Sequence, residues 1–225
     1  MNSESSKQKQ AFVLISLAGI FLALFACLTA LLLNYDLGAV GPENSVVGFS
    51  TVNKFIFDKL GQNDFWYKLT ELMGSLAIAV ALGFAAYTAI ELFRQKSIKK
   101  LDADLSVLII FYIIVALVYL VFEKALINYR PILVDGKLEA SYPSSHTLLT
   151  VFIMVTTIVQ LLNRLRNRAV KAVSIAVAVA IAVMVPVGRL LSGVHWFTDV
   201  LGGVFLGLAL SLCYAAFCKC IPDCD

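Results

Sequence analysis

Charged residues and histidines are scarce in this sequence, and the first shortage excludes an ordinary soluble domain. Only 15% of the 225 residues are charged, while 60% are hydrophobic and the mean hydropathy is +0.87. Soluble domains have roughly 25% charged and 45–50% apolar residues. The composition therefore indicates a membrane protein, whose first partner is the lipid bilayer. A net charge of only +3 gives no basic footprint for nucleic acid, so none is expected as a partner.

Cysteines are too few and too poorly spaced for a disulfide framework or a zinc site. Of five cysteines, Cys27 and Cys213 lie in apolar segments, and Cys218, Cys220 and Cys224 crowd the C-terminal end. A structural zinc ion needs four ligands, and these three cysteines have no histidine nearby. Two interpretations stay open for the tail: cysteines that remain reduced, or reversible lipidation.

Six hydrophobic runs are long enough to cross a bilayer, which takes roughly 17–25 residues as a helix. They are Ala11–Leu33, Leu69–Leu92, Leu105–Phe122, His146–Leu162, Val170–Val187 and Val200–Phe217. No internal repeat is visible, and the loops leave no room for a soluble domain. The sequence predicts an all-α, polytopic membrane bundle of six transmembrane helices, forming one domain over residues 1–225.

The loops between these runs predict the orientation. With the N-terminus inside, the cytoplasmic segments hold eleven of the 18 Lys and Arg residues, and the outer segments hold seven. Short cytoplasmic loops are enriched in positive charge. Both termini are therefore expected in the cytoplasm of a multi-pass plasma-membrane protein. The long outer connection, residues 34–68, is rich in aromatics and predicts a short interfacial helix, which is either a simple anchor or a cap over a site.

Three polar segments fall on the outer side in this topology. They are "EKALINYRP" (123–131), "YPSSH" (142–146) and "GRLLSGVHWFTD" (188–199). They contain the only two histidines, His146 and His195, and the only two outer arginines, Arg130 and Arg189. Each residue alone could be a helix cap or a headgroup anchor. Their convergence on one side instead favours an anion-binding site.

The spacing of His195 and Asp199 suggests a nucleophile. Residues four apart share a helix face, so the two side chains can meet. A carboxylate on one ring nitrogen fixes the tautomer and raises the basicity of the other nitrogen. The second histidine, His146, is then free to protonate a leaving oxygen, because an unperturbed pKa of ~6.5 suits acid–base work.

The remaining polar groups suit a phosphate. Two arginines, Arg130 and Arg189, can hold its oxygens in fork geometry. At a positive helix end, Ser144 and the backbone N–H groups of Ser145 and His146 add neutral donors. No outer cluster of Asp and Glu matches a divalent-cation site. The pattern predicts phosphoryl transfer with no metal and no cofactor.

These motifs resemble those of the type 2 phosphatidic acid phosphatases, whose relatives include glucose-6-phosphatase and the vanadium haloperoxidases. The family pattern is a Lys seven residues before an Arg-Pro, then Pro-Ser-Gly-His, then Ser-Arg, five residues, His, three residues and Asp. The resemblance covers residues 123–203 and implies six membrane helices. It also implies that His195 attacks phosphorus to form a phosphohistidine, that Asp199 orients it, and that His146 protonates the leaving group. The implied phosphate ligands are Arg130, Arg189, Ser144 and Ser145.

Three positions depart from the family pattern. Ser145 replaces the glycine of Pro-Ser-Gly-His, and Gly188 replaces the serine before Arg189. Lys124 lies six residues before Arg130, and Glu123 occupies the position seven before it. On a regular helix, six positions point far from the face that seven positions reach. Lys124 is a phosphate ligand only if a bulge turns it, and Glu123 is a candidate salt-bridge partner for an arginine.

Three functions compete. The first is hydrolysis of a membrane lipid phosphate or pyrophosphate on the non-cytoplasmic side, with phosphatidate, phosphatidylglycerol phosphate and polyprenyl pyrophosphates such as undecaprenyl pyrophosphate as candidate substrates. The second is a lipid phosphotransferase with the same intermediate. The third is a non-catalytic anion or lipid carrier, which gives no reason for the spacing of His195 and Asp199.

Overall fold

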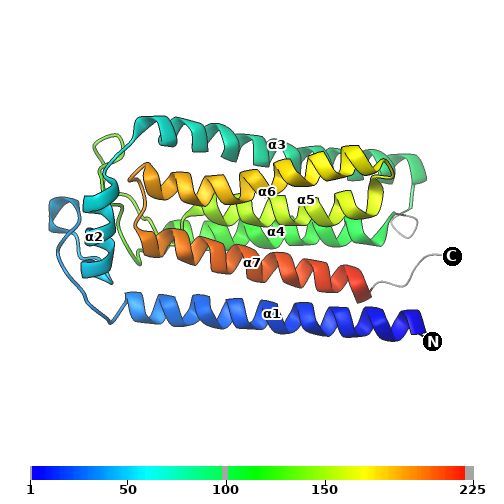
Figure 1. The fold of residues 1–225 in the computed structure, drawn as a ribbon, viewed down its shortest axis with the longest axis horizontal. Helices are drawn as coiled ribbons and strands as arrows, with labels where there is room; N and C mark the ends of the chain where they lie inside the picture. The colour runs from blue at the N-terminus through cyan, green and yellow to red at the C-terminus, as the bar shows by residue number, and fades with distance from the viewer. Residues whose placement is uncertain (1, 98–100, 221–225) are drawn as a thin grey trace.

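The computed structural model describes residues 2–97 and 101–220. Long α-helices make up most of these residues. They are numbered here as in Figure 1. They are α1 (Asn2–Leu32), α2 (Ser50–Leu60), α3 (Asp64–Gln95), α4 (Ala103–Lys124), α5 (Ser145–Arg164), α6 (Arg168–Leu191) and α7 (Phe197–Cys220), with a 3₁₀ turn at Pro42–Asn44. All except α2 run lengthwise in one bundle (Figure 1).

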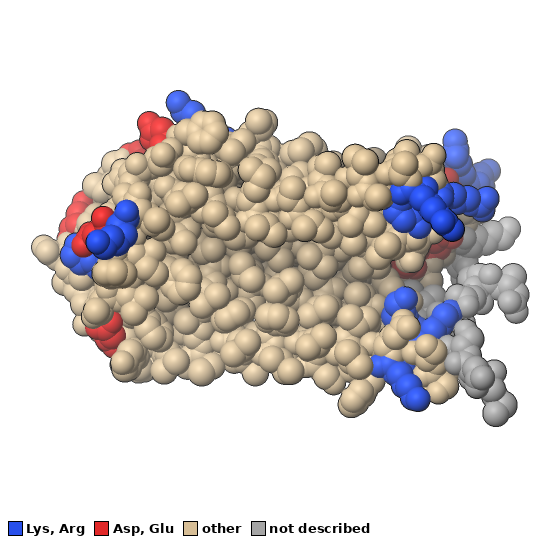
Figure 2. All heavy atoms as spheres, viewed as in Figure 1, with Lys and Arg blue, Asp and Glu red and all other residues tan. Residues whose placement is uncertain are grey.

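Six of these helices are long and apolar enough to span a membrane, as the sequence predicted. Figure 2 shows the result at the surface, where a wide band without charged side chains separates two charged ends. The first turn of α1 and the last turn of α7 lie at one end, opposite α2 (Figure 1). The chain is therefore a multi-pass membrane protein. The two ends of the bundle are called here the α2 end and the opposite end.

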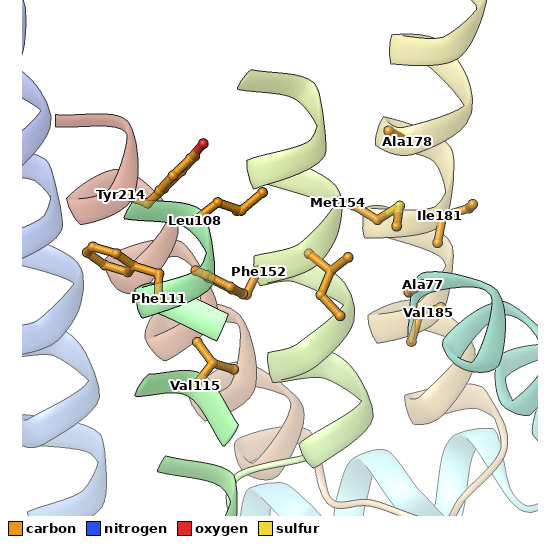
Figure 3. Packing of buried hydrophobic residues seen from close by; sticks show 11 residues of the cluster. Ala77, Leu108, Phe111, Val115, Phe152, Met154, Ala178, Ile181, Val185 and Tyr214 are labelled. Carbon is orange, nitrogen blue, oxygen red and sulfur yellow. The ribbon is translucent and has the colours of Figure 1, made fainter. Parts of the chain in front are cut away.

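The core of the bundle is arranged around α5. This helix has the largest buried share of the six spans, 56% of its most apolar window. Its residues Phe152 and Met154 lie in the middle of the main hydrophobic cluster (Figure 3). On one side they face Leu108 of α4 and Tyr214 of α7, and on the other Ile181 of α6. Because α5 is held from several sides, its first turn is a fixed platform for polar groups.

Helix α1 packs along α7, mainly through apolar side chains such as Phe25 and Leu206. The short helix predicted in the outer connection is α2, and it lies across the end of the bundle (Figure 1). Cys27, Cys213, Cys218 and Cys220 are free thiols. Cys224, part of the predicted tail cluster, lies outside the described residues.

Candidate active site

The first turn of α5 and the first turn of α7 meet at the α2 end of the bundle. The backbone N–H of Ser144 donates to the carbonyl oxygen of Asp199 at 2.9 Å. Gly203, one turn further along α7, faces the same segment, and a Cβ there would lie 2.8 Å from the Ser144 carbonyl oxygen. The absence of a side chain at residue 203 therefore lets the two backbones approach. Two motifs that are 50 residues apart in sequence become one site.

His195 lies just before α7 and is 2% exposed. Its Nδ1 is 3.4 Å from the Ser141 hydroxyl and 3.8 Å from Oδ2 of Asp199. The Ser141 hydroxyl donates to that same carboxylate oxygen. The predicted pairing of His195 and Asp199 is present, but the two residues do not share a helix face. Ser141, which the sequence did not reveal as a site residue, lies between them.

Asp199 is fully buried, and several donors hold its carboxylate. The backbone N–H of Trp196 donates to Oδ2 at 2.9 Å, and the Asn128 amide donates to Oδ1 at 3.4 Å. The Asn128 oxygen in turn accepts from the Gly48 backbone N–H at 3.2 Å. The outer connection (residues 34–68) is therefore linked to Asp199 through Asn128.

Helix α2 packs directly on the segment that carries His195. The Asn53 amide oxygen accepts from the Thr198 backbone N–H at 3.2 Å, and its nitrogen donates to the Thr198 hydroxyl at 2.9 Å. The Phe57 ring lies 5.5 Å from the buried ring of Trp196. Of the two interpretations of this connection, these contacts favour the covering helix over a simple anchor.

Ser144 is the N-cap residue of α5, yet its side chain does not cap the helix. The residue is fully buried, and its Oγ has no hydrogen-bond partner within the protein. A buried hydroxyl without a partner costs roughly 1–3 kcal/mol. The ordinary capping role therefore does not explain this serine, whereas an anion at the helix start would use the hydroxyl. Ser145, the first residue of α5, lines a cavity that also reaches His195.

Each arginine has an acidic partner, and neither partner is Glu123. Arg189 is 1% exposed and donates through Nη2 to Glu71 of α3, while its Nε has no partner. Arg130 has its Nε 3.3 Å from a carboxylate oxygen of Glu139, without the alignment of a hydrogen bond. The predicted salt bridge between Glu123 and an arginine is therefore wrong, because closer carboxylates take both arginines.

His146 also contacts Glu71. Its Nε2 lies 3.3 Å from Oε1, the same oxygen to which Arg189 donates. Glu71 was missed in the sequence because it lies outside the three polar segments. One signal could have found it: it is an acidic residue inside a predicted membrane span, and such residues are rare and usually functional.

His195 lies within electrostatic reach of both arginines and of His146. Burial lowers the pKa of His195 well below its ordinary value, and the positive charges of both arginines and of His146 lower it further. The imidazole is therefore neutral near pH 7, and its Nε2 has no hydrogen-bond partner in the protein. If Nδ1 donates its proton to Ser141, Nε2 carries the lone pair. A neutral nitrogen beside several free donors can attack an anion that those donors hold.

A narrow cavity of about 20 Å³, open to the surface, leads to His195. It is lined by Tyr119, Phe122, Glu123, Arg130, Ala140, Ser141, Tyr142, Pro143, Ser145, Leu148 and His195. Its walls combine polar groups around His195 with apolar side chains from α4 and α5. An amphiphile could place its headgroup beside His195 and its chain along Phe122 and Leu148.

Lys124 does not line this cavity. Helix α4 is continuous up to this residue, so no bulge turns the lysine, and its side chain is exposed. The position seven residues before Arg130 belongs to Glu123, which does line the cavity. Among the described residues, no group of three or more His, Cys, Asp or Glu side chains is arranged to hold a metal ion.

Comparison with known proteins gives two matches. Residues 122–220 match the sequence pattern of the PAP2 superfamily. The fold is similar to that of the crystal structure of a transmembrane PAP2-type phosphatidylglycerolphosphate phosphatase from Bacillus subtilis, with a TM-score of 0.66 and 20% identity. The alignment covers 92% of this chain and 98% of that one. No curated protein matches the sequence.

The matched residues 122–220 contain all three polar segments, and the α-helical bundle aligns with the structural neighbour over most of its length. The resemblance seen in the motifs is therefore confirmed: residues 122–220 of this membrane protein are similar to the PAP2 superfamily, and the fold is similar to that of a PAP2-type phosphatase.

Proposed function

We propose that this protein hydrolyses a lipid phosphate or lipid pyrophosphate at the non-cytoplasmic face of the plasma membrane, through a phosphohistidine at His195. The observation that carries the proposal is a set of buried polar atoms without hydrogen-bond partners in the three polar segments. They are Nε2 of His195, Oγ of Ser144, Nε of Arg189 and Nε of Arg130. Such atoms are rare in native proteins and call for a ligand. Three donors and one nucleophile suit a tetrahedral phosphate.

The first half-reaction transfers the phosphoryl group. His195 Nε2 forms a bond to phosphorus while the bond from phosphorus to the lipid oxygen breaks. Asp199 holds His195 through Ser141, which keeps the Nδ1 proton in place and directs the Nε2 lone pair at the substrate. The arginines and Ser144 stabilise the charge that develops on the non-bridging oxygens. His146 gives its proton to the departing lipid oxygen, so that no alkoxide is released.

The second half-reaction restores the enzyme. His146, now neutral, takes a proton from a water molecule, and that water oxygen forms a bond to phosphorus as the bond from phosphorus to His195 breaks. The products are inorganic phosphate and a protonated His146. No step needs a metal ion, because arginines and an imidazole supply the charge.

The lipid nature of the substrate follows from where the site lies. The cavity is lined partly by apolar side chains such as Phe122 and Leu148, which suit an acyl or prenyl chain whose headgroup reaches His195. The match of residues 122–220 to the PAP2 superfamily and the fold shared with a phosphatidylglycerolphosphate phosphatase support the same class of substrate. The excess of Lys and Arg in the loops at the opposite end supports a non-cytoplasmic site and cytoplasmic termini.

Phosphate release by purified protein in detergent, with EDTA present, tests the proposal. Phosphatidate, phosphatidylglycerol phosphate and undecaprenyl pyrophosphate are compared side by side, each with wild type and with His195→Ala. Release that survives EDTA and disappears in the variant is expected. Release that EDTA abolishes, or that persists in the variant, would contradict the mechanism. Phosphate binding without release would instead fit the carrier, and transfer to a second lipid would fit the phosphotransferase.

A further inference from the structure

Helix α3 contributes a charged residue to the site although it lies outside the PAP2-matched segment and outside all three motifs. Oε1 of Glu71 contacts both Nη2 of Arg189 and Nε2 of His146. Arg189 and His146 come from different helices, α6 and α5. A single carboxylate oxygen therefore connects a phosphate ligand to the group that handles the leaving-group proton.

The packing of α3 brings Glu71 to this position. Tyr67, Glu71 and Gly74 lie about one turn apart on one face of the helix. The Arg189 guanidinium lies 5.5 Å from the centre of the Tyr67 ring. At Gly74, a Cβ would lie 2.9 Å from a ring carbon of His146, so a side chain there would displace the histidine. This face of α3 is shaped to fit the two site residues.

The close packing of α3 also explains why residue 188 departs from the family pattern. The family has a serine before the arginine of the last motif, whereas this chain has Gly188. A Cβ at residue 188 would lie 2.4 Å from Cγ2 of Thr70. The close contact between α3 and α6 therefore requires the glycine. Two glycines, on different helices, permit the approach that places Glu71 beside Arg189 and His146.

The contact leaves Arg189 available to a substrate. Glu71 takes one terminal nitrogen of the guanidinium, and Nε has no partner. A guanidinium presents five N–H donors, so it can hold a carboxylate on one edge and a phosphate oxygen on another. Glu71 can therefore remain bound while a phosphate occupies the site.

We propose that Glu71 is a positioning residue that holds the His146 ring in the orientation needed to donate to the leaving oxygen and that favours its protonated form. This inference rests on the proposed function. A carboxylate that accepts the Nε2–H of His146 fixes the ring and stabilises the imidazolium, as second-layer carboxylates do for other active-site histidines. Glu71 touches neither the phosphorus nor the leaving group and acts through His146.

The test is Glu71→Gln with two substrates that differ in leaving group. Phosphatidate has a poor leaving group that needs a proton, whereas p-nitrophenyl phosphate has a good one that does not. We expect kcat for phosphatidate to fall at least about 10-fold, within the ~10²–10⁴-fold that a general acid supplies. For p-nitrophenyl phosphate, the rate constant of phosphohistidine formation is measured from the burst of nitrophenolate. We expect this rate constant to change less than about 3-fold.

Three variants make the result specific. Glu91→Gln is the matched control, since it is the same change on the same helix, at a residue that contacts Arg94 and Gln95 at the other end of α3. Glu71→Asp keeps the charge and should restore part of the activity. In a His146→Ala background, Glu71→Gln should have no further effect on phosphatidate, because the group through which it acts is gone.

Equal losses on both substrates, or a penalty that persists without His146, would overturn the inference. So would a Glu71→Gln variant that is as active as wild type, or one that binds inorganic phosphate more tightly and turns over faster, since Glu71 would then be a competitor for phosphate. His195→Ala, run in parallel, separates the two proposals. If that variant is active, the proposed function fails, whereas normal activity in Glu71→Gln alone overturns only the role of Glu71.

Discussion

Two arginines in ion pairs, one at each end of the bundle, differ in how many of their donors the protein uses. At the opposite end, Arg164 donates to Asp102 and Asp104 at 2.8 Å each, and its Nε donates to Gln160 at 2.6 Å. At the α2 end, Arg189 is more deeply buried but has a single carboxylate partner and an unpartnered Nε. A saturated arginine stabilises the fold, whereas an incompletely paired one is available to a ligand.

The same contrast extends to the neighbours of each arginine. Next to Arg164, Gln160 also donates to the Tyr214 hydroxyl and to Asp104. These hydrogen bonds join α4, α5 and α7. Near Arg189, the Ser144 hydroxyl and Nε2 of His195 have no hydrogen-bond partner. The bundle therefore has one polar cluster that holds helices together and another whose buried polar atoms are left without partners.

The largest expected effect comes from the open cluster. His195→Ala should lower kcat by at least about 10⁴-fold, because loss of a nucleophile leaves only binding and charge stabilisation. The protein should remain folded, since Nε2 makes no contact that the fold needs. Phosphate release and thermal unfolding in detergent measure the two effects. A variant with even a tenth of wild-type activity would refute the assignment of the nucleophile.

Arg189→Ala and Arg164→Ala test the comparison directly. Removal of Arg189 should lower kcat/KM by about 10²–10³-fold, which is typical for one charge-stabilising group. Removal of Arg164 leaves two carboxylates unpaired and should lower stability by about 1–3 kcal/mol, between the values for exposed and buried pairs. Its activity per folded molecule should not change. If Arg189→Ala lost mainly stability and Arg164→Ala lost mainly activity, the distinction between the two clusters would be wrong.

Ser141→Ala should have a smaller effect than either change at the reacting atoms. The hydroxyl connects Asp199 with His195, and its loss leaves the imidazole without its nearest polar contact. A decrease in kcat of about 10–100-fold is expected, comparable to other losses of an orienting partner. Ser211→Ala is a control, because that serine bonds only the backbone of its own helix at the carbonyl of Gly207. Equal effects of the two changes would mean that Ser141 has no orienting role.

The pH dependence should reflect the lowered pKa of His195. Because the folded-state pKa is below the unfolded value of ~6.5, His195 is still neutral where an ordinary histidine is half protonated. Nucleophilic activity in kcat/KM should therefore persist below pH ~6.5. The stability that this group contributes is present above ~6.5 and is lost as the pH falls toward the folded-state pKa. An acidic limb of kcat/KM with a midpoint at or above pH ~6.5 would contradict this assignment.

Lys124→Ala should have the smallest effect, with kcat/KM changed by less than about 3-fold. Substitutions of exposed side chains away from the site usually have small effects. Its neighbour Glu123 lines the cavity, but the lysine does not. Arg130→Ala, measured with it, is the reference for a phosphate ligand. A comparable loss in the two variants would show that Lys124 reaches the phosphate.

Much of this arrangement could be predicted from the sequence because it depends on local patterns. Hydrophobic length gives the six spans, and the two histidines with their neighbours mark the α2 end. Contacts between distant segments could not be predicted in this way. Ser141 acts only because the loop before α5 folds against Asp199, and Glu71 only because glycines allow α3 to approach α5 and α6. Neither of these contacts can be recognised from the spacing of residues along the chain.

The phosphohistidine is the central claim, and its direct isolation is the most decisive test. In His146→Ala, a substrate with a good leaving group such as p-nitrophenyl [³²P]phosphate should still phosphorylate the enzyme, while the hydrolysis of the intermediate should be slow. The account predicts labelled protein that is stable to alkali and labile to acid, with the label on His195, and no label in His146→Ala/His195→Ala. Label on another residue, or phosphate release from His146→Ala without any labelled protein, would contradict it.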